Sequence, residues 1–145
     1  RRWGRDAMST PGYWEVEHTA DVSLGIRGRQ LDELFRCAAQ GLFALLRPQP
    51  AGPCQPIQRS VILEALDSEA LLVDWLAELL YLVEAERARL DRFEFLSIDS
   101  RHLHARCSGA APCRPERSIK AVTFHNLRIA RNEAGMLEAT ITFDL

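Results

Sequence analysis

EVEHTADVSLGIR, residues 15–27, alternates between apolar and polar side chains. Successive side chains of a β-strand point to opposite faces, so the alternation predicts one half-buried strand with a dry face and a wet face. The dry face would carry Val16, His18, Ala20, Val22, Leu24 and Ile26. The wet face would carry Glu15, Glu17, Thr19, Asp21, Ser23 and Arg27. We therefore expect Asp21 to be solvated and able to take up a cation, and His18 to lie among apolar groups.

The composition indicates one soluble globular domain. The chain has 145 residues, of which 47% are hydrophobic and 26% charged, and this suits a single core. We expect residues 1–12 to be a flexible leader and residues 13–145 to form one domain. The net charge of -2 argues against a protein that mainly neutralises nucleic-acid phosphates. No apolar run is long enough for a bilayer and no secretory signal is present, so we expect a cytoplasmic protein without a membrane partner.

The cysteines show no close paired spacing, which predicts reduced thiols rather than a disulfide framework. They are Cys37, Cys54, Cys107 and Cys113. Two of them form a loose cluster with two histidines: His102, His104, Cys107 and Cys113. This cluster leaves two interpretations open, a zinc site or a hairpin with scattered polar residues.

The apolar spacing changes along the chain between helical and strand periods. Three- and four-residue spacing predicts a helix over residues 31–46 and a second, more buried helix over residues 69–87, with Asp67 or Ser68 as its N-cap. Four of the seven prolines fall within residues 47–58, which predicts a surface loop before a strand over residues 57–65. Further strands are expected near residues 93–98, 103–107, 119–124 and 136–145. This order predicts an α+β class: a two-layer domain with a largely antiparallel sheet and both helices packed on one of its faces.

The last predicted strand ends in acidic oxygens. Asp144 would lie on the wet face of this strand, beside the terminal carboxylate of Leu145. If that face lies near Asp21, the converging oxygens would make a site of the kind that calcium or magnesium prefers. The alternative is an ordinary solvated aspartate at the end of a strand.

Lys120 is the only lysine in a chain with 18 basic residues. Lysine and arginine differ in size, hydration and donor geometry, so this exception suggests a site that a guanidinium would not fit. A lysine on the solvent face of its strand is the alternative. His125, near the end of the same predicted strand, is either a base or a structural residue.

Five separated motifs resemble the archease family. They are HTADV at residues 18–22, LDELF at 31–35, VDWLAELLY at 73–81, IKAVTFHNL at 119–127 and FDL at 143–145. They cover nearly all of residues 13–145 in order. The chain departs from the family pattern at Ala77, where asparagine is common, and in the proline-rich segment.

The resemblance implies the archease fold and a role as activator of an RtcB-type RNA ligase in transfer-RNA splicing and RNA repair. Such a ligase forms a covalent guanylate on its own histidine with GTP and a divalent metal. An archease promotes that guanylylation and multiple-turnover joining, does no covalent chemistry itself and meets RNA only indirectly. The resemblance also implies a metal, typically calcium with magnesium or manganese as alternatives, on Asp21, Asp144 and Leu145. It ties Lys120 to activation, and we take His18 and His125 as supporting candidates.

Two functions from other classes remain open on the residues alone. One is a stand-alone metal-dependent hydrolase that uses Asp21, Asp144 and a histidine. The other is a chaperone-like protein-binding module in which the metal is only structural.

Overall fold

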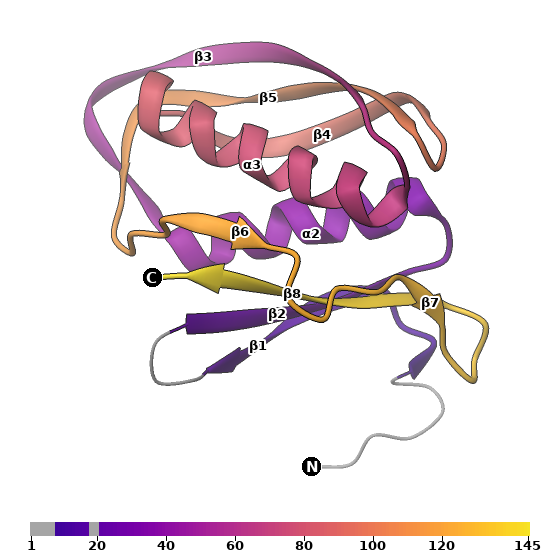
Figure 1. The fold of residues 1–145 in the computed structure, drawn as a ribbon. Helices are drawn as coiled ribbons and strands as arrows, with labels where there is room; N and C mark the ends of the chain where they lie inside the picture. Colours follow the sequence, from indigo (N-terminus) through magenta and orange to yellow (C-terminus); the bar gives the residue numbers. More distant parts are fainter. Residues whose placement is uncertain (1–7, 18–20) are drawn as a thin grey trace.

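The computed structural model describes residues 8–17 and 21–145 (Figure 1). The strands are β1 (Gly12–Glu17), β2 (Asp21–Gly28), β3 (Pro48–Glu64), β4 (Arg89–Ile98), β5 (His102–Pro115), β6 (Ala121–Thr123), β7 (Ala130–Arg131) and β8 (Leu137–Asp144). The helices among them are α2 (Leu31–Leu46) and α3 (Ser68–Glu86). His18 lies outside the described residues. Of the expected leader, Met8 and Thr10 accept hydrogen bonds from Asn132 and Arg27, and β1 begins at Gly12.

The strands form two antiparallel sheets, with the helices between them (Figure 1). The first has the order β1-β2-β8-β6, with β7 also paired to β8, and the second has the order β3-β5-β4. Helix α2 packs on β2 and also contacts β4, while α3 contacts β3, β5 and β6. The α+β class and the antiparallel pairing are therefore confirmed. The structure differs from the expected two layers because a second sheet covers the helices on their other side.

Residues 15–27 were predicted to form one continuous strand, but they contribute to two strands, β1 and β2. β1 and β2 pair antiparallel from Gly12 opposite Arg27 to Glu17 opposite Val22, so the chain reverses between them. The reversal changes the face that β1 residues occupy. Val16 lies opposite Ser23, on the face away from the helices, and is 40% exposed instead of joining the core. Because the period-two alternation continues through this change of chain direction, the alternation alone does not reveal that the chain reverses.

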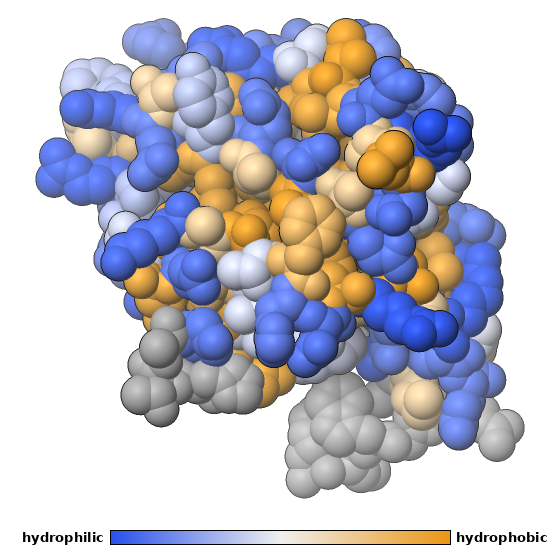
Figure 2. All heavy atoms as spheres, in the orientation of Figure 1, coloured by the Kyte–Doolittle hydropathy of each residue, from blue (hydrophilic) through white to orange (hydrophobic). Residues whose placement is uncertain are grey.

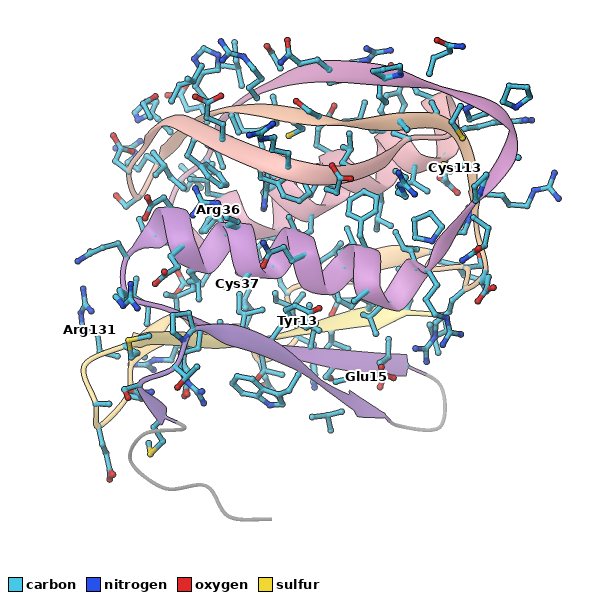
Figure 3. The ribbon with its side chains drawn as sticks, turned by 180° about the vertical axis from the view of Figure 1, so that it is seen from behind. Tyr13, Glu15, Arg36, Cys37, Cys113 and Arg131 are labelled. Carbon is cyan, nitrogen blue, oxygen red and sulfur yellow. The ribbon has the colours of Figure 1, made fainter. Side chains whose placement is uncertain are left out.

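The inner face of β2 supports α2. Val22, Leu24 and Ile26 are buried, as the alternation predicted. Gly41 of α2 lies against Leu24: a Cβ at this glycine would stand 2.6 Å from a Leu24 methyl carbon. Tyr13 of β1 reaches the same place, 3.0 Å from that position, and Figure 3 shows it beneath α2. The glycine therefore allows the helix to approach the sheet closely.

Both helices form where the apolar spacing predicted them. Asp67 caps α3 by accepting a hydrogen bond from the Ala70 amide at 2.8 Å. Trp75, fully buried on α3, donates its indole N–H to the Phe35 carbonyl oxygen of α2 at 3.0 Å. One narrow side of α3 is open to solvent, with Asp74 and Tyr81 exposed. Figure 2 shows apolar groups between hydrophilic ones over this side of the molecule.

The proline-rich segment is part of β3 and not the predicted loop. Pro48 lies opposite Pro115 and Pro50 opposite Cys113, and the pairing resumes at Gln55 after an irregularity. β3 is an edge strand, which tolerates prolines because an outward-facing position needs no backbone N–H. Its partner β5 likewise continues through residues 108–112, beyond the strand that was expected near residues 103–107.

Candidate functional site

The two aspartates singled out from the sequence lie opposite each other in the first sheet. β2 and β8 pair antiparallel, and Asp21 is the direct partner of Asp144. Opposite residues of an antiparallel pair share a face, with Cβ atoms about 4.5–5.5 Å apart. β2 and β8 therefore bring the two carboxylates together on the face away from the helices, as the predicted cation site requires.

Hydroxyl and amide groups continue this face next to the aspartates. Ser23 and Thr142 form the next residue pair on this face, and their hydroxyl oxygens are 3.2 Å apart. A pocket of about 420 Å³ opens there and is lined by Asp21, Ser23, His125, Asn126, Thr140 and Thr142. In β8, Thr140, Thr142 and Asp144 alternate with the buried Ala139, Ile141 and Phe143, so period-two alternation is sufficient to find the hydroxyl row.

Asp21 is less solvated than the alternation predicted. Its Oδ1 atom is buried and has no hydrogen-bond partner among the described residues. Ser23 and Arg27, expected on the same wet face, are each only 6% exposed. The Trp14 side chain covers part of the face, with its ring centroid 4.7 Å from the Arg27 guanidinium carbon. A buried carboxylate oxygen without a donor is costly, and a bound cation is one group that removes the cost.

The donor set fits a hard cation better than zinc. Within residues 8–17 and 21–145, no group of three or more His, Cys, Asp or Glu side chains is placed to hold a metal. The interpretation of His102, His104, Cys107 and Cys113 as a zinc site is therefore wrong. Cys107 is buried in the middle of β5. All four residues lie on β5, which forms a hairpin with β4, as the other interpretation expected. Two carboxylates with main-chain oxygens suit calcium, magnesium or manganese, which fill remaining positions with water.

Lys120 and Leu145 lie at the same end of the sheet. The Lys120 amide donates to the Asp144 carbonyl oxygen at 2.8 Å, and the next residue, Ala121, is the partner of Asp144 across β6 and β8. Lys120 directly precedes β6 instead of standing within a longer strand, and its side chain is exposed. Leu145 follows Asp144 and is half-buried. Residues from three strands thus meet around the Asp144 backbone.

His125 lines the pocket beside Asp21. The next residue, Asn126, has a left-handed backbone with φ of 55°, a conformation that asparagine adopts more readily than most residues. Its Nδ2 lies 3.1 Å from His125 Nε2, and the His125 amide donates to the Thr123 hydroxyl at 3.3 Å. Asn126, which also lines the pocket, did not stand out from the sequence because its left-handed backbone leaves no local pattern.

Arg27 anchors the far end of the same face. It donates to the Glu138 carboxylate at 2.7 Å, and β2 and β8 place these two residues opposite each other. Gly25 is two residues before Arg27 on the same face of β2. A Cβ on Gly25 would stand 2.0 Å from the Trp14 indole, so glycine is required for the tryptophan to lie there. A second pocket, of about 280 Å³, shares Asn126 and Thr140 with the first and includes Glu138. The outer face is therefore a polar groove with the aspartates at one end.

Residues 13–145 match the family model described as the Archease protein family (MTH1598/TM1083). The chain belongs to the archease family. It is 33% identical over 143 residues to the protein archease of Methanosarcina mazei, which covers 92% of this chain and 95% of that one. The archease fold is also found in the solution structure of Methanobacterium thermoautotrophicum protein 1598, with a TM-score of 0.67 and 26% identity over 92% of this chain and 99% of that chain.

A second solved archease, from Thermotoga maritima, is described as a possible chaperone. Its TM-score is 0.65, and at 20% identity over 90% of this chain and 94% of that chain it shows the shared fold alone. Neither archease helix of the described residues has the length and apolar character needed to cross a membrane.

Proposed function

We propose that this archease activates an RtcB-type RNA ligase through a divalent metal held by Asp21, Asp144 and Leu145. The observation that carries the proposal is the direct pairing of Asp144 with Asp21, whose buried Oδ1 atom has no hydrogen-bond partner within residues 8–17 and 21–145. Family membership supplies the second support, since the motifs that contain both aspartates belong to the matched region.

The residues of this chain would act by position and charge. The Asp21 and Asp144 carboxylates hold the cation from two adjacent strands, and the main-chain oxygens at Leu145 complete the protein's share of the ligands. When bound, a divalent cation neutralises phosphate charge and orients phosphate oxygens. The covalent guanylate forms from GTP on the histidine of the ligase, so this chain needs no nucleophile of its own and meets RNA only indirectly.

Lys120 would place one positive charge beside that site. Its backbone is fixed by the hydrogen bond to Asp144, while its exposed side chain is free to reach outward. An ammonium is a compact point charge, whereas a guanidinium is a wide planar fork. We infer that Lys120 contacts a phosphate or a carboxylate in the guanylylation site of the ligase.

The test is ligase guanylylation and multiple-turnover RNA joining, measured with GTP and calcium, magnesium or manganese, with and without this chain. We expect stimulation by the unmodified chain and a loss of at least tenfold, about 1.4 kcal/mol of coupling, for Asp21→Ala or Asp144→Ala. Lys120→Arg should lose most of the stimulation although it keeps the charge. Asp74→Ala, on the exposed side of α3, is the matched control and should stimulate normally.

Two outcomes would replace the proposal. Full stimulation by Asp21→Ala and Asp144→Ala, with ligase binding retained, would favour a chaperone-like module with a structural metal. Turnover of generic phosphoesters by the isolated chain with metal, lost in the same variants, would favour a hydrolase. In either case the family assignment stands and the activation mechanism does not.

A further inference from the structure

Two cysteines far apart in the sequence meet at the irregular part of β3. Cys54 lies between Pro50 and Gln55, where the pairing with β5 shifts, and Cys113 of β5 is the partner of Pro50. The Cys54 thiol is 3.5 Å from the carbonyl oxygen of Pro112, the residue that precedes Cys113. The Cys54 side chain is also close enough to the Cys113 thiol to raise its pKa. Figure 3 shows Cys113 where β5 runs alongside β3.

The two thiols differ in exposure. Cys54 is exposed, whereas Cys113 is only 1% exposed. An oxidant in solution therefore reaches Cys54 first, and Cys113 stands behind it as a resolving thiol. This arrangement of an accessible thiol beside a second, protected thiol is typical of reversible oxidation sites.

A positive charge lies next to the protected thiol. The Arg89 Nε atom is buried and has no hydrogen-bond partner among the described residues. Burial and the neighbouring Cys54 raise the pKa of Cys113, and the Arg89 guanidinium opposes that rise. A Cys113 thiolate would give this buried guanidinium a negatively charged neighbour. Arg89 therefore only partly offsets the rise in the pKa of Cys113.

We propose that Cys54 and Cys113 form a reversible intramolecular disulfide, which makes this part of β3 an oxidation site. With a hydroperoxide as oxidant, the Cys54 thiolate attacks one peroxide oxygen, the O–O bond breaks and the alcohol or water leaves, giving Cys54 sulfenic acid. The Cys113 thiolate then attacks the Cys54 sulfur, the S–O bond breaks and water leaves. One peroxide is reduced and two thiols are oxidised, so the electrons balance. This inference is independent of the proposed ligase activation.

The disulfide would fasten the irregular part of β3 to β5 and close a loop that contains α3 and β4. Shortly after Cys113, the chain is held by hydrogen bonds from the Glu116 and Arg117 amides to the Leu46 carbonyl oxygen, and it then reaches Lys120. Closing a loop of this size restricts the unfolded chain, and we expect oxidation to raise the Tm by roughly 5–10 °C.

The experiment uses the full reduced chain, treated with hydrogen peroxide, after which free thiols are alkylated and the peptides are mapped by mass spectrometry. We expect a peptide that joins Cys54 to Cys113, lighter than the two thiol peptides by two hydrogens, which dithiothreitol reverses. Formation should become faster as the pH rises above neutral, because the raised pKa of Cys113 limits its thiolate fraction.

The variants separate this disulfide from general oxidation. Cys54→Ser, at an exposed position that leaves the core intact, should form no linked peptide and show no peroxide-induced rise in Tm. Cys37→Ser, a substitution of a buried thiol on α2, is the control and should still form the link. Alkylation of both Cys54 and Cys113 after excess peroxide, or a disulfide only between two chains, would overturn the proposal.

Discussion

Replacing Asp21 by asparagine should stabilise the metal-free protein and remove its response to calcium. In the absence of a cation, the two carboxylates of the Asp21–Asp144 pair face each other with the same charge, which destabilises adjacent strands. Asparagine keeps the size of the side chain, removes this repulsion and gives the buried position a donor. A bound calcium ion reverses the balance, because it stabilises only the folded state that assembles both carboxylates.

The expected shifts follow from simple estimates. A pair of charged side chains directly opposite each other on antiparallel strands is worth up to about 1 kcal/mol, and for two like charges this energy is a repulsion. Unfolding 145 residues changes the entropy by about 0.3 kcal/mol/K, so this repulsion lowers the Tm by about 3 °C. Calcium at about 100 times its dissociation constant adds about 2.7 kcal/mol, a rise of about 9 °C.

Thermal unfolding in chelator and in calcium measures both effects. We expect the Asp21→Asn protein to melt about 3 °C above the unmodified protein in chelator and to gain little from calcium. Asp74→Asn, with a carboxylate on the exposed side of α3, should match the unmodified protein in both conditions. Equal calcium shifts for Asp21→Asn and the unmodified protein would refute the reasoning, as would a lower Tm of the variant in chelator.

Three further substitutions test a helix cap, a buried hydrogen bond and a buried thiol. Asp67→Ala removes the cap of α3 and should cost about 1 kcal/mol, measured by urea unfolding. Trp75→Phe loses the buried hydrogen bond to Phe35 and part of the indole volume, and should cost about 2–3 kcal/mol in the same assay. Burial raises the pKa of Cys107 from 9.0 to about 12, so the unfolded chain loses this proton first as the pH rises. Stability should therefore fall by up to roughly 1.4 kcal/mol per pH unit above pH 9, and Cys107→Ala should flatten that slope without changing it below pH 8.

The helices were predictable because their signal is local and repeated. α2 begins and ends at Leu31 and Leu46, as the apolar spacing indicated, and α3 ends within a residue of its expected limit. Each has several apolar residues that repeat with the helical period, so one ambiguous position changes little. The strand that carries the prolines was not predictable in this way, because its edge position depends on which strands pair and not on its own residues.

The candidate site was predictable in its residues but not in its surroundings. Asp21, Asp144 and Lys120 stood out through strand faces and composition, and β2, β8 and the start of β6 place them together. The burial of Asp21 Oδ1 was missed because its neighbours are distant in the sequence, as His125 and Asn126 of the shared pocket are, and no local pattern reports such neighbours.

The carboxylate pair on the outer face depends on packing on the inner face. Val22, Leu24 and Ile26 of β2 lie opposite Phe143, Ile141 and Ala139 of β8, and all six are buried. A shift of β8 by one residue would turn Phe143 and Ile141 outward and Asp144 into the core. Exposing these two side chains costs about 3–6 kcal/mol before the charge of Asp144 is counted. The hydrophobic core therefore fixes the register, and the register alone brings Asp144 opposite Asp21.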